Sequence, residues 1–257
     1  MMQDYVLITG ASSGIGEAFA YAYAKAGRNV LLVSRSEDKL KKLSKNLEEK
    51  YNVLTDVIAM DLSKEHSGKE LYHAVEEKGL LVTVIINNAG FATKGLFTDT
   101  DYQQQHNEIL LNVSALTEIT YFFIQDMVKR GTGTIINIAS AASFNPLPFS
   151  AVYAATKSYV LSFTESVSFE YKDKGIRVLA VCPGATDTHF FDNYDAVVKK
   201  LRKPQDVVDT TFKALQRKNI VCTDGIFCKS QVLLHRIVSR KFALKIFGNA
   251  GKNTWEK

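Results

Sequence analysis

The sequence has few cysteines for the disulfide bonds that stabilise small secreted proteins, and it lacks the long apolar segments that anchor a chain in a membrane. Its 257 residues include only three cysteines and four prolines. Cys182, Cys222 and Cys228 are odd in number and form no CxxC pair, which argues against a disulfide framework and for a reducing, cytoplasmic compartment. No run of about 18 apolar residues is present, and no basic segment leads into an apolar stretch near Met1. We therefore expect no transmembrane segment.

Patterns typical of metal sites and nucleic-acid surfaces are missing as well. The five histidines and three cysteines show no ligand spacing, so no metal is expected. The net charge is +5, and residues 229–257 hold seven basic residues and one acidic residue. This tail carries +6, so the rest of the chain sums to −1. A nearly neutral body argues against nucleic acid as a partner.

Short apolar runs alternate with longer segments of helical spacing. The runs are rich in β-branched residues and nearly continuous, as in strands that are covered on both faces. They predict strands at 5–9, 29–33, 53–60, 84–88, 134–139, 176–182 and 220–222, and helices at 15–26, 37–50, 64–78, 102–129, 152–174 and 204–216.

This alternation predicts parallel βαβ units with right-handed crossovers. We expect an α/β protein with a single-domain Rossmann fold, whose doubly wound, mostly parallel sheet has six to seven strands and helices on both faces. The catalytic domain is expected to span residues 1–228. Residues 229–257 are expected to form a basic, apolar helical extension of the same domain.

A glycine-rich turn joins the first predicted strand to the first helix. Glycines allow a tight turn and close approach of the backbone to a pyrophosphate, and the helix N-terminus offers free N–H donors. The strand before and the helix after favour a dinucleotide site over a purely structural turn. The candidate residues are Gly10, Ser12, Ser13, Gly14, Ile15 and Gly16.

Ser34 and Arg35 follow the second predicted strand, 19 residues beyond Gly16 in the case of Arg35. NAD sites place an acid near this point for the ribose hydroxyl, whereas an arginine suits the 2′-phosphate of NADP. We therefore expect NADP(H) to be preferred over NAD(H). The alternative is that Arg35 is a solvated residue opening the next helix.

Ser140 follows the fifth predicted strand, and Tyr153 and Lys157 are spaced four apart on a helix. Residues at this spacing share a helix face, so the ammonium group can lie near the phenol and lower its pKa toward neutrality. Asn112, in an apolar part of the 102–129 segment, is a polar amide that needs partners. Each residue also has a purely structural interpretation. Tyr153 and Lys157 could be an ordinary helix pair, Ser140 a cap, and Asn112 a side chain that braces a strand.

The ordered set of motifs resembles the short-chain dehydrogenase/reductase family over roughly residues 4–225. The resemblance implies a hydride transfer between a nicotinamide cofactor and a carbonyl or alcohol. The matching motifs are residues 9–16 (TGASSGIG), Asp61-Leu62, residues 87–90 (NNAG), Asn112, Ser140, Tyr153-x-x-x-Lys157 and Pro183-Gly184-x-x-x-Thr188.

The resemblance also implies roles. Tyr153 would be the acid or base at the substrate oxygen, which Ser140 would orient. Lys157 would hold the nicotinamide ribose and lower the Tyr153 pKa, and Asn112 would carry a proton-relay water. The residues implied to contact the cofactor elsewhere are Asp61, Leu62, Asn88, Ala89, Gly90, Pro183, Gly184 and Thr188.

Two departures from the family pattern are present. The glycine turn has Ser12 and Ser13 where many NADP-preferring members have a basic residue, and the chain continues after Gly225 into the basic tail. The family implies a homodimer or homotetramer. The tail is open to three interpretations: packing on the domain or a partner subunit, peripheral contact with an anionic membrane, or a solvated end.

Aromatic residues mark the expected substrate walls, 141–150 and 185–203. They are Phe144, Phe149, Phe190 and Phe191. They favour a hydrophobic ketone or a ketoacyl, steroid-like or aromatic substrate, unless they pack the loops themselves. The sequence thus predicts an NADP(H)-dependent oxidoreductase, with a non-catalytic NADP(H)-binding redox sensor as the alternative.

Overall fold

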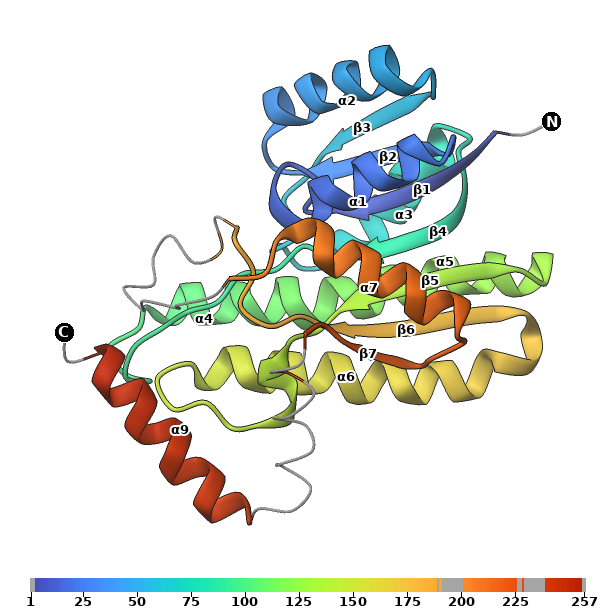
Figure 1. The fold of residues 1–257 in the computed structure, drawn as a ribbon. Helices are drawn as coiled ribbons and strands as arrows, with labels where there is room; N and C mark the ends of the chain where they lie inside the picture. Colours follow the sequence, from blue (N-terminus) through green and yellow to red (C-terminus); the bar gives the residue numbers. More distant parts are fainter. Residues whose placement is uncertain (1–2, 189, 191–200, 226–227, 229–238, 256–257) are drawn as a thin grey trace.

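Seven parallel strands form one sheet in the computed structural model, which describes residues 3–188, 190, 201–225, 228 and 239–255 (Figure 1). The strand order is β3-β2-β1-β4-β5-β6-β7. This confirms the predicted Rossmann-like α/β fold. The strands are β1 (Asp4–Thr9), β2 (Asn29–Ser34), β3 (Thr55–Ala59), β4 (Leu81–Asn87), β5 (Gly133–Ile138), β6 (Ile176–Cys182) and β7 (Val221–Thr223).

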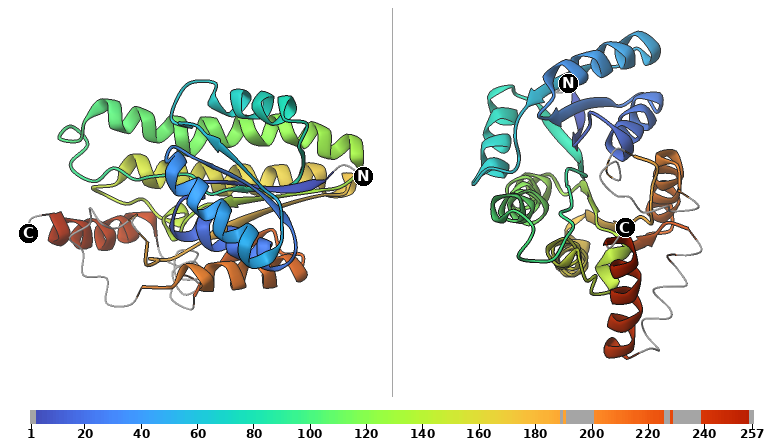
Figure 2. Two further views of the ribbon diagram at one scale, coloured as in Figure 1. Left: turned by 90° about the horizontal axis from the view of Figure 1, so that it is seen from above. Right: turned by 90° about the vertical axis from the view of Figure 1, so that its left-hand side faces the viewer.

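Helices cover both faces of this sheet (Figure 2). Helices α1, α2 and α7 pack on one face, and α3, α5 and α6 pack on the other. Their bounds are α1 (Gly14–Lys25), α2 (Glu37–Tyr51), α3 (Ser67–Glu77), α4 (Tyr102–Ile109), α5 (Leu116–Arg130), α6 (Ala151–Tyr171), α7 (Pro204–Gln216) and α9 (Arg240–Trp255).

Strand β1 shows why the strand segments read as unbroken apolar runs. Val6 and Ile8 belong to the core beneath α1, α2 and α7, whereas Tyr5 and Leu7 belong to the core beneath α3, α5 and α6. Because successive side chains of a strand point to opposite faces, a sheet buried on both faces needs apolar residues at every position.

The predicted helix at 102–129 is divided by a change in backbone hydrogen bonding. Helix α4 runs into a π-helical segment, η1 (Leu110–Ala115), which continues as α5. The Asp101 side chain caps α4 by accepting from Gln104 N at 2.8 Å, and α5 ends at Gly131 with φ +69°. Wider π turns are common at functional sites, and η1 contains Asn112.

Strand β1 is the point at which the chain changes direction across the sheet. It lies between β2 and β4, so the first crossovers extend the sheet one way and the later ones extend it the other way. Ligands of open α/β sheets bind outside the carboxyl ends of the strands at such a switch point. The fold therefore places the candidate site beyond Thr9, Asn87 and Ile138, at the ends of β1, β4 and β5.

Helix α9 lies beside the loop that leads into α6 (Figure 1). A Cβ atom added at Gly251 would lie 2.8 Å from Phe149 Cδ2 and 3.0 Å from Pro148 O, so the helix approaches this loop closely. Ala243 is buried, whereas Phe242 is 55% exposed. Among the helices that the structure describes, none has the length and apolarity to cross a membrane.

Candidate active site

One cavity of about 1800 Å³ opens at the carboxyl ends of the strands. It brings together most of the predicted site residues, from the glycine turn at one end to Phe190 at the other. Those that line it are Gly10, Ser12, Ser13, Gly14, Ile15, Ser34, Arg35, Asp61, Leu62, Asn88, Ala89, Gly90, Ser140, Tyr153, Lys157, Pro183, Gly184, Thr188 and Phe190.

The glycine turn has the geometry that close approach of a ligand backbone requires. Gly10 and Gly14 have φ values of +64° and +60°, a region that L side chains rarely adopt. A Cβ atom at Gly16 would collide with the Gly10 carbonyl oxygen. Ser13 precedes α1 without capping it through its side chain. The first turn of α1 therefore fits a pyrophosphate, as a nicotinamide dinucleotide would supply.

Asn88 and Thr9 hold the glycine turn against the end of β4. Asn88 Nδ2 donates to Thr9 O at 3.0 Å and to Gly10 O at 3.2 Å. Thr9 Oγ1 accepts from the N–H groups of Asn88 and Ala89, both at 3.0 Å. These four bonds fix the turn relative to β4, so that residues far apart in sequence keep a constant spacing across the cavity.

Charged groups at the far end of the cavity come from β2 and from the loop after β3. Arg35 follows β2 and is exposed. Burial raises the pKa of the Asp61 carboxyl, but hydrogen bonds from Ser63 and the charges of Arg35 and Lys64 outweigh it and hold the pKa below its usual value. Asp61 therefore stays ionised at neutral pH beside a cation that faces the same cavity.

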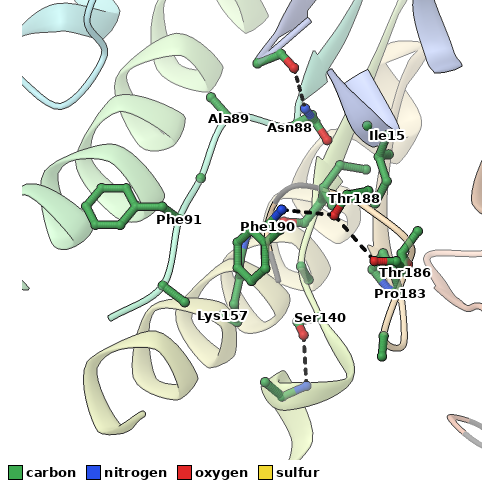
Figure 3. A pocket seen from close by; sticks show the side chains of 18 of the residues that line it. Ile15, Asn88, Ala89, Phe91, Ser140, Lys157, Pro183, Thr186, Thr188 and Phe190 are labelled. Carbon is green, nitrogen blue, oxygen red and sulfur yellow. Dashed lines mark hydrogen bonds between the residues drawn. The ribbon is translucent and has the colours of Figure 1, made fainter. Parts of the chain in front are cut away.

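Ser140, Tyr153 and Lys157 line the other end of the cavity. Figure 3 shows Ser140 and Lys157 there, together with Phe190. Ser140 Oγ accepts from Ala142 N at 3.1 Å, which leaves its hydroxyl hydrogen available to a ligand. Tyr153 and Lys157 lie one turn apart on α6, with Nζ 6.0 Å from the centre of the phenol ring. The Phe190 ring lies 5.6 Å from the Tyr153 ring.

The Lys157 ammonium group is almost completely buried. Its side chain is 5% exposed, and Nζ donates to Ile138 O at 2.8 Å. Burial lowers its pKa to about 8, and the negative charge of Glu108 acts in the opposite direction. Lys157 is therefore mostly protonated at pH 7 and places a cation next to the Tyr153 ring.

Asn112 does not line the cavity; it braces the segment behind it. Its Nδ2 donates to Phe91 O at 2.9 Å and to Thr156 Oγ1 at 3.1 Å, and its Oδ1 accepts from Phe91 N at 3.2 Å. Both amide hydrogens are thus used within the protein. The predicted relay role of the Asn112 side chain stays a prediction, whereas its structural role is visible.

The four predicted substrate aromatics separate in the structure. Phe190 lines the cavity. Phe144 ends the short helix η2 (Ala141–Phe144) and packs against the core cluster of Leu116 and Val160 instead. Phe149 lines a second cavity of about 140 Å³. Phe191 lies outside the described residues.

Several lining residues carry no motif and were not predicted. Phe91 and Leu111 lie near the reactive end, and Phe247 reaches the cavity from α9. Behind the wall, Glu108 is fully buried and accepts two bonds from Thr93. Glu108 follows the polar run 103–107 of α4, in which a carboxylate is ordinary, so no local signal indicated either Glu108 or Phe247.

Residues 4–198 match the family model described as short chain dehydrogenase. The chain belongs to the short-chain dehydrogenase family. Among curated relatives, the rat (Rattus norvegicus) very-long-chain 3-oxoacyl-CoA reductase is 35% identical over 207 residues, which are 78% of this chain and 62% of that protein. This chain thus spans about three fifths of the relative's length.

Solved structures of short-chain dehydrogenases share the whole fold. The enzyme from Sphingobium yanoikuyae, in complex with NADPH, is 31% identical with a TM-score of 0.81 over 86% of this chain and 87% of that one. The bulky-bulky ketone specific alcohol dehydrogenase from Comamonas testosteroni is 31% identical with a TM-score of 0.77 over 85% of each chain.

Proposed function

We propose that this short-chain dehydrogenase is an NADP(H)-dependent reductase of hydrophobic ketones, or the corresponding alcohol dehydrogenase. The observation that carries the proposal is the single cavity that joins Arg35, at the cofactor end, to Ser140, Tyr153 and Lys157 at the reactive end. The bound nicotinamide supplies or accepts the hydride. The chain's own residues bind, orient and move the proton.

Tyr153 is the residue that transfers the proton to or from the substrate oxygen. Ser140 donates its free hydroxyl hydrogen to the substrate oxygen and holds it in place, while the Tyr153 hydroxyl gives its proton to that oxygen in reduction. The Lys157 cation stabilises the phenolate that remains, which makes the proton transfer easier near neutral pH. In oxidation the same groups act in reverse.

The test is NADPH oxidation with a panel of ketones, using the wild type and Tyr153→Phe. We expect the variant to lose roughly 10²–10⁴-fold in kcat, the usual contribution of a positioned acid. Equal activity in both proteins would contradict the assignment of Tyr153. No turnover by either protein, together with tight NADPH binding, would favour the redox sensor.

Arg35 supports the proposed preference for NADP(H). No acid stands at the end of β2, where a carboxylate would repel a 2′-phosphate, and Arg35 lines the cavity. In Arg35→Ala the KM for NADPH should rise roughly tenfold or more, the loss of a charged hydrogen bond, with little change for NADH. Lys39→Ala is the matched control, because Lys39 is exposed on α2 and does not line the cavity. Equal effects of both substitutions would refute the role of Arg35.

The apolar lining beyond Tyr153 supports a hydrophobic substrate. Leu111, Leu147, Phe190 and Phe247 all line the cavity. The similar proteins include a very-long-chain 3-oxoacyl-CoA reductase and a bulky-bulky ketone specific alcohol dehydrogenase. We expect long-chain or bulky apolar ketones to give higher kcat/KM than small charged ketones. The reverse order would remove the hydrophobic pocket from the proposal.

Exposed aromatics on α5 and α6 support the proposed homodimer or homotetramer. Tyr121 is 61% exposed and Phe169 is 67% exposed, and large apolar side chains are enriched at subunit contacts. The three cysteines are buried thiols that are not joined in disulfides, which supports a cytoplasmic location. Sedimentation velocity of the wild type and a Tyr121→Glu, Phe169→Glu variant tests the contact; identical oligomers would place it elsewhere.

A further inference from the structure

Glu108 is a buried carboxyl group that the chemistry above does not use. It lies near the end of α4 and is 0% exposed. Its Oε2 accepts from Thr93 N at 3.0 Å and from Thr93 Oγ1 at 2.6 Å. Its Oε1 has no hydrogen-bond partner among the described residues. A buried carboxylate oxygen without a partner is costly, so the atom indicates a site for an ordered water.

Glu108 and Asn112 hold the same extended segment from adjacent turns of the helix. Asn112 pairs with the backbone of Phe91 through two bonds, and Glu108 holds Thr93 through two more. Gly90, at the start of this segment, lies against the reactive lysine. A Cβ atom there would be 2.8 Å from Asn112 Oδ1 and 3.5 Å from Lys157 Nζ. The hydrogen bonds of Asn112 and those of Glu108 therefore both fix the backbone of this segment beside the Lys157 ammonium group.

Few charged groups act on that ammonium group. Helix α4, which carries Glu108, packs against α6. The Glu108 carboxyl and the Cys182 thiol at the end of β6 act on the ammonium group electrostatically, and Tyr153 is one turn away on its own helix. Burial raises the pKa of Cys182 far above its usual range, so this thiol is neutral at neutral and mildly alkaline pH. Burial raises the pKa of the Glu108 carboxyl, whereas the hydrogen bonds from Thr93 and the charge of Lys157 act to lower it. In its ionised form Glu108 is the anionic neighbour of Lys157 among the described residues.

Asn112 does not act as a counter-charge for Lys157. Its amide is neutral, and both of its N–H groups are already donated to Phe91 and Thr156. Lys157 Nζ donates one of its three hydrogens to Ile138 O, so it retains donors for a further acceptor. The free oxygen of Glu108 and these donors are complementary.

We propose that Glu108 is the positioning residue and buried counter-charge of Lys157, and that its free Oε1 accepts from a water to which the Lys157 ammonium group also donates. Glu108 keeps Lys157 protonated at pH values where burial alone would release its proton. The cation beside Tyr153 is thereby maintained through neutral pH. The proposal rests on the function above only for the use of that cation; the charge pairing exists without turnover.

The test measures the titration of Lys157 directly. The protein is labelled with 13C at lysine Cε, and the Lys157 signal is assigned by its absence in Lys157→Met. Glu108→Gln removes the charge while its amide oxygen still accepts from Thr93. Thr93→Val removes one of the two hydrogen bonds between Thr93 and Glu108 and keeps the Glu108 charge. We expect the Lys157 midpoint to fall by about one pH unit in Glu108→Gln, as for loss of a nearby opposite charge, and to stay in place in Thr93→Val.

An unchanged midpoint in Glu108→Gln would overturn the proposal. Equal shifts in both variants would also overturn it, because a loosened segment rather than a charge would then be responsible. If Glu108→Gln fails to fold, the Glu108 carboxyl is titrated instead, in the wild type and in Lys157→Met, where loss of the cation should raise the midpoint reciprocally. An unmoved carboxyl midpoint would refute the pairing.

The same three proteins separate this proposal from the proposed function. With the best ketone, the alkaline limit of NADPH oxidation should move to lower pH in Glu108→Gln and not in Thr93→Val. A wild type that reduces no ketone would refute the function while leaving the lysine titration intact. A normal reductase whose Lys157 midpoint ignores Glu108 would refute only the pairing.

Discussion

Replacing Lys157 by methionine removes a buried charge and should change how stability depends on pH. The lysine pKa is about 8 in the folded protein and 10.5 when unfolded. Below pH 8 both states bind the proton, so the folded state bears the full cost of burying the charge. Between these values the unfolded state binds more protons, and the free energy of unfolding rises with pH.

The size of this rise follows from the two values. They differ by about 2.5 pH units, each worth about 1.36 kcal/mol once the pH lies well beyond both values. Between neutral pH and 10.5 the wild type should gain most of this, about 3 kcal/mol, relative to Lys157→Met. Other titrating groups, such as Tyr23, whose pKa burial raises to about 12, are common to both proteins and cancel in the difference.

Urea unfolding followed by circular dichroism, in steps from neutral pH to 10.5, measures the effect. Only the difference between the two proteins matters, because the substitution also removes the bond to Ile138 O and so offsets the variant by a constant. Parallel curves for wild type and Lys157→Met would show that Lys157 is not a protonated, buried group, and the reasoning about the Tyr153 proton would fail with it.

Two further substitutions probe the frame of the site. Gly16→Ala forces a Cβ atom into the backbone of the glycine turn, so it should lower the free energy of unfolding by about 1–3 kcal/mol and weaken NADPH binding. The control Gly248→Ala on α9, where a Cβ atom makes only an ordinary contact, should change neither quantity. Calorimetry measures the stability, and a fluorescence titration measures NADPH binding. Asp224 is 0% exposed and accepts two bonds from Arg202, so Asp224→Asn should lose about 3 kcal/mol. Asp206 lies 3.6 Å from the same guanidinium, and its side chain is more exposed than that of Asp224, so Asp206→Asn should lose less than about 1 kcal/mol of stability. Equal losses for the two variants in urea unfolding would show that burial of Asp224 does not strengthen its pairing with Arg202.

Much of the fold was predictable because its signals are local. The β6 bounds, Ile176–Cys182, and the α7 bounds, Pro204–Gln216, agree with the prediction from sequence. Strand β3 is shorter than predicted, since it pairs with β2 only over Thr55–Ala59. The predicted helix at 102–129 contains a π-helical segment that hydrophobic periodicity does not reveal.

Most of the residues predicted for the cofactor and the reaction line one cavity, and the sequence could single them out because their motifs are contiguous and ordered. The glycine turn needs its glycines for its own φ angles, and Tyr153 and Lys157 lie one turn apart on a single helix. The substrate wall was predicted less well. Phe144 and Phe149 have the right chemistry, but packing against the core and against α9 decides where each side chain lies.

The sequence by itself determined the alternation of strands and helices, the glycine turn, and the identity of Ser140, Tyr153 and Lys157, because each depends on residues close together in the chain. Only the tertiary structure decided that α4 packs against α6, so that the Glu108 charge acts on Lys157, and that Phe247 reaches the cavity from α9. Burial, and with it the pKa of Lys157, is a property of all the elements packed around a group. It arises only when β5, α4 and α6 meet, and no local pattern encodes that meeting.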